Sequence, residues 1–396
     1  MNTALKHWKE AATVILAART KYKRSVESLW REPNPVPNPV PNPAFDYEVL
    51  LLKRSGKSGF MPNAYVFPGG LVGPSDFSAE WLEVFKAFRH LPEFGLATVK
   101  QPRETRPPMF ATDRKQLGSP VPGDVAFRIC AVRETFEESG VLLVLPSQEA
   151  NPQTTDHHPG KDRSDNCVTR SGLTELSDRW DKSLIAKWRS LVLENSWNFI
   201  RMCRELECVP NIWALYEWGN WLTPTGASRQ QRRYDTAFYM CCLKDIPDTL
   251  QDQMEIELYK WSTPPEILHS YREREVWIAH PQLYDIGRMC KFPLLSDLQD
   301  FAEQRSIEGC ERCLPVILKA TDCNISLLPG DSLYPEKTDI SVTTEKCLEE
   351  LQKDSPNLHR IVIHDPYKNS VYMNITPKYK HLRPLTTSES KHDSKL

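Results

Sequence analysis

Residues 125–141 place two opposed requirements on one helix. Apolar side chains recur at spacings of four, three and four residues, as in the stripe with which a helix docks on a sheet: Val125, Ile129, Val132 and Phe136. Glu137 and Glu138 stand three and four residues after Glu134, so three carboxylates share another face of the same helix. The segment therefore predicts a helix with one face in a core and concentrated negative charge on the other.

Carboxylates that repel one another can share a surface when a hard divalent cation neutralises them. Mg²⁺ takes oxygen ligands from the protein and from substrate phosphates. A Glu137-Glu138 pair alone would be typical of a solvated helix face, but a third carboxylate on the same face indicates phosphate chemistry.

The string Arg133-Glu134-x-x-Glu137-Glu138-x-Gly140-Val141, preceded by Phe67-Pro68-Gly69-Gly70, resembles the box of the Nudix hydrolases. That box reads Gly-x5-Glu-x7-Arg-Glu-U-x-Glu-Glu-x-Gly-U, where U is aliphatic. With Gly70 as the first glycine, Asp76 stands at the first glutamate and Thr135 at an aliphatic position. Fifty-six residues (77–132) then stand where the box has seven, an insert of about 49. The metal-binding half of the box is complete.

The resemblance implies an α/β fold, the Nudix α/β/α sandwich with a mixed sheet, here with a large insertion in the box and a C-terminal α+β extension. We expect a Nudix domain over residues 1–275, with the insert at about 77–123 and a polar loop at about 148–171. The extension would cover 276–385, and a flexible tail 386–396.

The resemblance also implies roles for individual residues. Glu134 and Glu138 are the expected ligands of Mg²⁺ or Mn²⁺, and Glu137 is a third ligand or a catalytic positioning group. Arg133 would pair with a neighbouring carboxylate, while Gly69 and Gly70 let the substrate loop pass close to the helix. The catalytic base stays open among the glutamates. Glu255 or Glu257 could supply it, and we take Glu257 as the candidate.

A second passage is similar to the coenzyme A diphosphatase branch of the Nudix superfamily. It runs from Trp221-Leu222-Thr223-Pro224 to Arg232-Arg233-Tyr234-Asp235-Thr236-Ala237-Phe238-Tyr239. Arg232 and Arg233, with Lys53 and Arg54 upstream of the glycines, are therefore candidate substrate contacts. Membership of this branch implies hydrolysis of coenzyme A and fatty-acyl-coenzyme A to adenosine 3′,5′-bisphosphate and (acyl-)4′-phosphopantetheine.

Other functions stay open at this point. A Nudix enzyme could act on NADH, although that branch carries a two-pair cysteine zinc ribbon and here only Cys310-x2-Cys313 is present. ADP-ribose is a further substrate that the box allows. A non-catalytic nucleotide-binding module is the remaining alternative, which the intact glutamates disfavour.

Composition and the last residues bear on partners and location. A net charge of −2 gives no general attraction to nucleic acid or to a membrane surface, and we expect a monomer that binds neither. The 11 cysteines, an odd number at irregular positions, indicate reduced thiols. Ser394-Lys395-Leu396 matches the address read by the peroxisomal import receptor, so we expect a peroxisomal protein.

Overall fold

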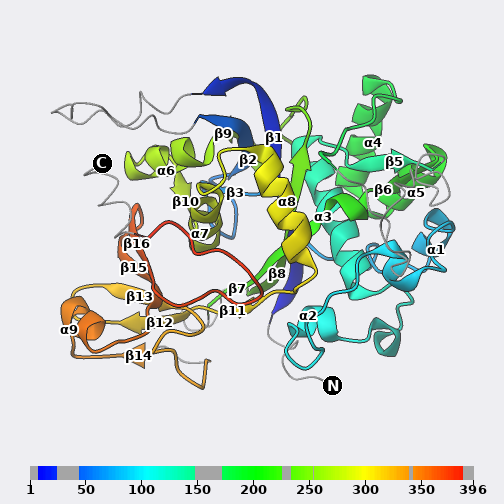
Figure 1. Ribbon diagram of the computed structural model, residues 1–396. Coiled ribbons are helices and arrows are strands. Elements are labelled where there is room, and N and C mark those ends of the chain that lie inside the picture. The colour runs from blue at the N-terminus through cyan, green and yellow to red at the C-terminus, as the bar shows by residue number, and fades with distance from the viewer. Residues whose placement is uncertain are drawn as a thin grey trace.

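The computed structural model describes residues 8–24, 44–147, 172–224, 233–252, 254–338 and 342–386 (Figure 1). The predicted polar loop at 148–171 and the tail beyond 386 lie outside these ranges. None of the helices in the described ranges combines the length and the hydrophobicity that crossing a bilayer requires.

A nine-stranded sheet forms the centre of the molecule. Its main path is β10-β3-β2-β1-β8-β7-β11, with β4 paired to β1 and β9 paired to β2. The sheet is mixed, because β1 runs parallel to β8 and antiparallel to β2. Its strands are β1 (Lys9–Arg24), β2 (Phe45–Arg54), β3 (Ala64–Val66), β4 (Gly69–Leu71), β7 (Tyr216–Leu222), β8 (Tyr234–Leu243), β9 (Ile256–Ser262), β10 (Trp277–Ile278) and β11 (Arg312–Cys313).

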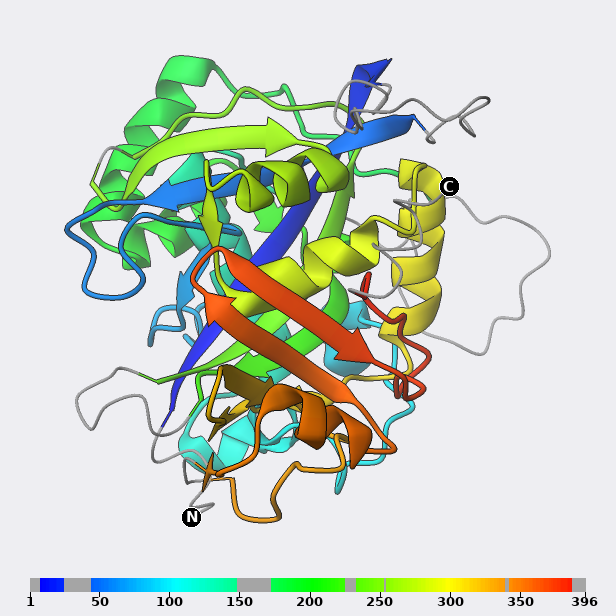
Figure 2. The same cartoon turned by 90° about the vertical axis from the view of Figure 1, so that its left-hand side faces the viewer.

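Helices cover both faces of this sheet (Figures 1 and 2). The apolar run 11–18 lies in β1, where alternate side chains enter two different cores and all are buried. One face carries α3 (Gly123–Ser139), α4 (Lys182–Glu194), α5 (Trp197–Glu205) and the small sheet of β5 (Val144–Pro146) and β6 (Cys208–Pro210). The other face carries α6 (Pro264–Arg272), α7 (His280–Met289) and α8 (Leu295–Ser306). The predicted α/β/α sandwich is confirmed.

The insert of the box is an ordered cap beside α3. It contains α1 (Trp81–Val84), η3 (Pro92–Gly95), α2 (Pro108–Ala111) and η4 (Arg114–Leu117), and it joins the same core as α3. Aromatic rings hold it, since the centroids of Phe88 and Trp213 are 4.3 Å apart and Phe85 meets Trp213 edge-on at 6.0 Å. Trp213 lies in η5 (Ile212–Ala214), far along the chain.

The C-terminal unit is a five-stranded sheet, in the order β14-β12-β13-β15-β16, with one short helix. A tight turn joins the last two strands as an antiparallel hairpin, with Asp365 opposite Lys368. The elements are β12 (Val316–Lys319), β13 (Asn324–Leu327), β14 (Val342–Thr343), α9 (Leu348–Lys353), β15 (His359–Asp365) and β16 (Lys368–Met373).

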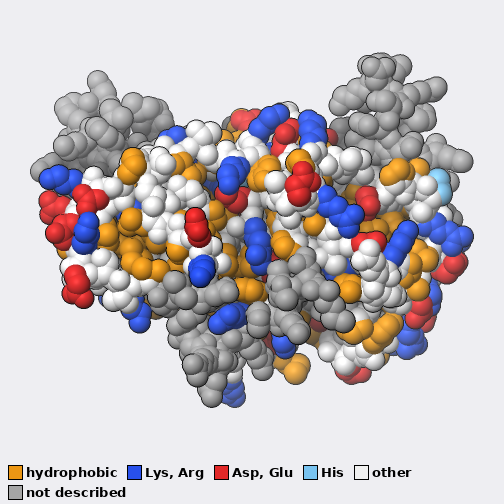
Figure 3. All heavy atoms as spheres, turned by 90° about the horizontal axis from the view of Figure 1, so that it is seen from below, with side chains coloured by type: hydrophobic (Ala, Val, Ile, Leu, Met, Phe, Trp, Pro, Cys, Tyr) orange, Lys and Arg blue, Asp and Glu red, His pale blue; other side chains and the backbone are white. Residues whose placement is uncertain are grey.

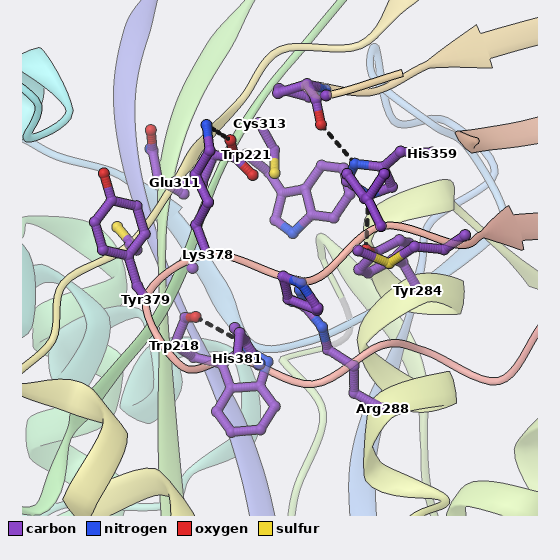
Figure 4. A pocket seen from close by; sticks show the side chains of 18 of the residues that line it. Trp218, Trp221, Tyr284, Arg288, Glu311, Cys313, His359, Lys378, Tyr379 and His381 are labelled. Atoms are coloured by element: carbon purple, nitrogen blue, oxygen red, sulfur yellow. Dashed lines mark hydrogen bonds and ion pairs between the residues drawn. The ribbon is translucent and has the colours of Figure 1, made fainter. Parts of the chain in front are cut away.

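Residues 276–313, which we had expected to belong to the extension, form part of the main domain. They supply β10 and β11 to the central sheet and α7 and α8 to its face. The C-terminal unit then packs on this layer around a cavity of about 50 Å³ (Figure 4). There the Tyr284 hydroxyl donates to Nε2 of His359 over 2.8 Å, and Nδ1 of His359 donates to the Pro329 carbonyl over 2.7 Å. This cavity is lined by none of the three glutamates of α3.

Candidate active site

Helix α3 presents the carboxylates. Its predicted apolar stripe is fully buried, and Gly140 ends the helix with a positive φ of 74°, which favours glycine. Glu138 lies against β4 and is only 3% exposed, while Glu134 and Glu137 are half-buried. The carboxylates therefore do not lie on an open, fully solvated helix face.

The two glycines of β4 lie against these carboxylates. The Gly69 amide donates to Oε2 of Glu138 over 2.8 Å. A Cβ atom at Gly70 would come within 2.4 Å of Oε2 of Glu134, so only glycine leaves space for that carboxylate. The loop and helix expected to meet are therefore in contact, and Glu134 and Glu138 are both held beside β4.

Arg133 is the centre of an ion-pair network. Its Nε and Nη2 atoms each lie 2.9 Å from an oxygen of Asp76, and its Nη1 lies 2.8 Å from both Glu134 Oε1 and Glu137 Oε1. Asp76 is fully buried and also accepts a hydrogen bond from the Gly73 amide over 2.8 Å. The residue that replaces the first glutamate of the box thus holds Arg133, which in turn orients two of the three carboxylates.

The carboxylates carry more negative charge than the protein compensates. Burial, the nearby charges of Glu137 and Asp76 and the opposing effect of Arg133 leave the pKa of Glu134 raised to about 7. Burial first, and then the charge of Glu134, raise the pKa of Glu138 well above its usual range. Asp76, Glu134 and Glu137 share the single guanidinium of Arg133, and Glu138 adds a fourth carboxylate beside Glu134, so this excess favours binding of a cation.

A divalent cation with oxygen ligands fits this set of donors. In the described ranges, no three acidic, cysteine or histidine side chains already converge at metal-binding distance, because Arg133 and Gly69 hold the glutamates in the arrangement given above. Carboxylate oxygens are the donors that hard divalent cations prefer, so Glu134, Glu137 and Glu138 are the residues that could hold such an ion.

Glu255 and Glu257, the two candidates for the catalytic base at the start of β9, have different surroundings. Glu257 is exposed, accepts a hydrogen bond from the Gly56 amide over 3.0 Å and pairs with Lys53 at 3.7 Å. The carboxylate whose charge raises the pKa of both Glu137 and Glu138 is Glu255. Glu255 is also exposed, but its charge, unlike that of Glu257, acts on two carboxylates of α3, so the structure favours Glu255 where the sequence had favoured Glu257.

The other basic candidates differ in position. The charge of Arg54 lowers the pKa of Glu138, so Arg54 acts on the carboxylates of α3. Its guanidinium also donates to Ser58 Oγ over 3.0 Å and to the Phe60 carbonyl over 3.1 Å, which holds loop 55–63. Lys53 is turned to Glu257. Arg233 is described just before β8, whereas Arg232 and the targeting residues Ser394, Lys395 and Leu396 lie outside the described ranges.

Sequence reasoning missed Arg189 of α4. Its Nε and Nη2 atoms donate to the Glu137 carbonyl over 3.0 and 2.8 Å, which satisfies an unpaired carbonyl at the end of α3. Nη2 also donates to the Leu250 carbonyl over 2.7 Å. A single arginine on an amphipathic helix carries no signal in the sequence that would identify this partner.

Glycines at the start of a strand, facing the carboxylates of an Arg-Glu-x-x-Glu-Glu helix on a mixed sheet, define the Nudix class of hydrolases. Comparison of the sequence with protein families agrees. A family described as the NUDT19 Nudix domain matches residues 8–289, and one described as the NUDT19 C-terminal domain matches residues 317–374. The chain belongs to the NUDT19 family of Nudix proteins.

Three curated relatives extend over almost the whole chain, and each is called acyl-coenzyme A diphosphatase NUDT19. The Xenopus laevis protein is 46% identical over 99% of this chain and 100% of its own length. The Gallus gallus protein is 46% identical over 100% of both, and the Homo sapiens protein is 39% identical over 95% of this chain and 94% of its own. A crystal structure of a Nudix hydrolase from Alicyclobacillus acidocaldarius superposes with a TM-score of 0.46 at 17% identity, covering 74% of this chain and 96% of that one.

Proposed function

We propose that this chain hydrolyses the diphosphate bond of coenzyme A and its fatty-acyl esters, releasing adenosine 3′,5′-bisphosphate and (acyl-)4′-phosphopantetheine. The observation that carries the proposal for the reaction is the contact of two glycines with two glutamates. Gly69 donates to Glu138, and Gly70 lies against Glu134, which Arg133 orients. The substrate is supported by the relatives, which are named acyl-coenzyme A diphosphatases.

The reaction requires water to attack a phosphorus atom that negatively charged oxygens surround. We propose Mg²⁺ or Mn²⁺ as the ion that neutralises those oxygens and lowers the pKa of the attacking water, held by Glu134, Glu137 and Glu138. Arg133 fixes Glu134 and Glu137 from behind through its paired contact with Asp76. Gly70 leaves the space in which the Glu134 carboxylate lies beside the strand.

One experiment separates the candidate substrates. Purified protein is incubated with Mg²⁺ and oleoyl-coenzyme A, NADH or ADP-ribose in parallel, and the products are identified by mass. We expect adenosine 3′,5′-bisphosphate to be released fastest. Faster release of reduced nicotinamide mononucleotide from NADH, or of ribose 5-phosphate from ADP-ribose, would replace the proposed substrate, and absence of turnover with every substrate would leave a nucleotide-binding module.

We also propose a peroxisomal location, in which the import receptor binds Ser394-Lys395-Leu396. A fluorescent protein fused to the N-terminus should co-localise with a peroxisomal marker, and deletion of Leu396 should leave it diffuse. We infer a monomer that binds neither nucleic acid nor membranes. Light scattering at several protein concentrations checks the first point, and co-sedimentation with DNA and vesicles the second.

A further inference from the structure

A cluster of cationic and aromatic side chains lies where the central strand β1 begins. The guanidinium carbons of Arg233 and Arg312 lie 5.8 and 5.6 Å from the centre of the Trp8 ring. The Trp8 indole nitrogen donates to the Thr223 carbonyl over 3.1 Å, which fixes the ring. Both distances are within the range of cation–π attraction, so the ring holds the two arginines in place.

This cluster carries excess positive charge. The Nη2 atom of Arg312 lies 3.9 Å from a carboxylate oxygen of Asp235. The Nε atom of Arg312 is buried and has no hydrogen-bond partner. Arg233 is half-buried and makes no ion pair with any residue in the described part of the chain. Asp235, which also accepts a hydrogen bond from Asn220 over 2.6 Å, is the one carboxylate paired with the cluster among the described residues, and the neighbouring Glu10 is paired with Arg114. Such an excess favours an anionic ligand.

The cluster and the carboxylates of α3 lie on either side of the same short stretch of β1. On one edge, the Lys9 amide donates to the Arg233 carbonyl over 2.8 Å, and on the other the Val72 amide donates to the Glu10 carbonyl over 3.1 Å. Arg233 is level with Trp8 and Gly70 with Ala12, four residues further along β1, so with two interstrand spacings the backbones of Arg233 and Gly70 lie about 16 Å apart. Gly70 lies against Glu134, so the cluster and the glutamates lie along one stretch of β1, two strands apart.

A second connection runs through loop 55–63. Arg54, whose charge acts on Glu138, donates to the Phe60 carbonyl over 3.1 Å, and the Phe60 ring meets the Tyr234 ring at 4.7 Å. Figure 2 shows this loop and the adjoining ends of β7 and β8 on the same side of the molecule. Figure 3 views the molecule from the end at which β1 begins, where Lys and Arg side chains are interspersed with acidic and hydrophobic ones.

We propose that Arg233 and Arg312, held against Trp8, bind the 3′-phosphate on the ribose of coenzyme A while the diphosphate lies at the glutamates. This inference rests on the proposed function, because it assigns the substrate's second phosphate group to the same site. A phosphomonoester dianion matches the paired donors of a guanidinium. NADH and ADP-ribose have no phosphate at that position, so the cluster selects coenzyme A against both.

The test compares coenzyme A with 3′-dephospho-coenzyme A. For the unchanged protein we expect a lower KM for coenzyme A. Arg233→Gln should raise that KM about tenfold or more, with kcat nearly unchanged, because a hydrogen bond to a charged group is lost. The KM for the dephosphorylated substrate should change far less, and Arg233→Lys should restore part of the difference. Equal changes for both substrates would overturn the proposal.

Arg274→Gln is the matched control, since its guanidinium lies 5.9 Å over the Tyr367 ring but on α6's side of the sheet. Arg274→Gln should leave the KM for coenzyme A lower than the KM for 3′-dephospho-coenzyme A, as in the unchanged protein. Calorimetry then separates failure of this inference from failure of the proposed function, because it requires no turnover. Adenosine 3′,5′-bisphosphate should bind more tightly than AMP, and Arg233→Gln should remove the difference. Equal binding of both nucleotides by the unchanged protein excludes the 3′-phosphate site, whether or not coenzyme A is hydrolysed.

Discussion

Arg133 and Asp76 are joined by two hydrogen bonds of 2.9 Å, although 57 positions separate them. Asp76 and Arg133 stand directly before and after the insert 77–132, so their contact holds the two ends of the insert together at the site. A buried guanidinium is thereby held in one orientation, which makes it a fixed support for Glu134 and Glu137.

Asp76→Asn should destabilise the fold and reduce turnover together. Removing one partner of a buried ion pair costs about 3 kcal/mol, because the remaining charge stays uncompensated. Urea unfolding and kcat measure the two effects. Glu80→Gln is the control, since Glu80 pairs with Arg204 at the surface and should change the unfolding free energy by less than about 1 kcal/mol. Equal losses in both variants would contradict the supporting role of Asp76.

Gly70→Ala should abolish most activity while the protein stays folded. The added methyl group would come within 2.4 Å of the Glu134 carboxylate and displace it, and a misplacement of about 1 Å can cost about 100-fold in rate. Gly59→Ala, where no atom lies within 4 Å of the added carbon, should retain normal kcat. If Gly70→Ala turns over normally, Glu134 does not act from the position seen beside β4.

Glu138→Gln should abolish metal-dependent turnover and leave the fold intact. The amide oxygen of glutamine can still accept the Gly69 hydrogen bond, but the charge that attracts the cation is gone. We expect kcat to fall by at least about 100-fold at every Mg²⁺ concentration, with an unchanged circular dichroism spectrum. Near-normal kcat at saturating Mg²⁺ would remove Glu138 from the metal ligands.

Glu255→Gln should reduce kcat more than Glu257→Gln does. Glu255 acts electrostatically on Glu137 and Glu138, whereas Glu257 is held at the surface by Gly56 and Lys53. Parallel kinetics of the two variants provide the measurement. A larger loss in Glu257→Gln would reinstate the assignment made from the sequence.

Acid should weaken the attachment of the C-terminal unit through His359. Burial, with a smaller contribution from the Arg288 charge, lowers the pKa of His359 to about 4, below the value of about 6.5 in an unfolded chain. The stabilising contribution of the neutral ring is therefore present above pH about 6.5 and is lost as pH falls towards about 4. Between pH about 7.5 and about 5 this loss is about 2 kcal/mol.

His359→Gln should make the unfolding free energy less dependent on pH over that interval. The exposed His364 on the same strand is the control, and His364→Gln should keep the original dependence. The same pH dependence in all three proteins would show that His359 does not titrate with unfolding.

Much of the site could be predicted because its signals are local. The helical spacing of Val125, Ile129, Val132 and Phe136 identifies the buried side of α3, and the glutamates then fall beside β4 as expected. The partnership of Arg133 with Asp76 is not local, since the insert hides the usual spacing of the box. The sequence therefore left the role of Asp76 open.

Other features depend on packing that periodicity does not encode. Glu255 and Glu257 are equally plausible from spacing, but an irregularity in the pairing of β2 with β9 between Lys53 and Arg54 changes which one lies at the site. The amphipathic patterns of α7 and α8 predict helices without identifying the surface they cover, so residues 276–313 had been expected in the extension. Arg189 and Trp8 likewise act through partners far away in sequence.

The parallel pairing of β1 with β8 fixes when the site can form during synthesis. A nascent chain that has left the ribosome up to Val141 contains every glutamate of the box, yet one edge of β1 still lacks its neighbour, residues 234–243. Trp213, on which the insert packs, also emerges later. The site can therefore form only late in translation. A chain released after Val141 but before residue 243 would contain the whole motif and lack the strand that completes the sheet around it.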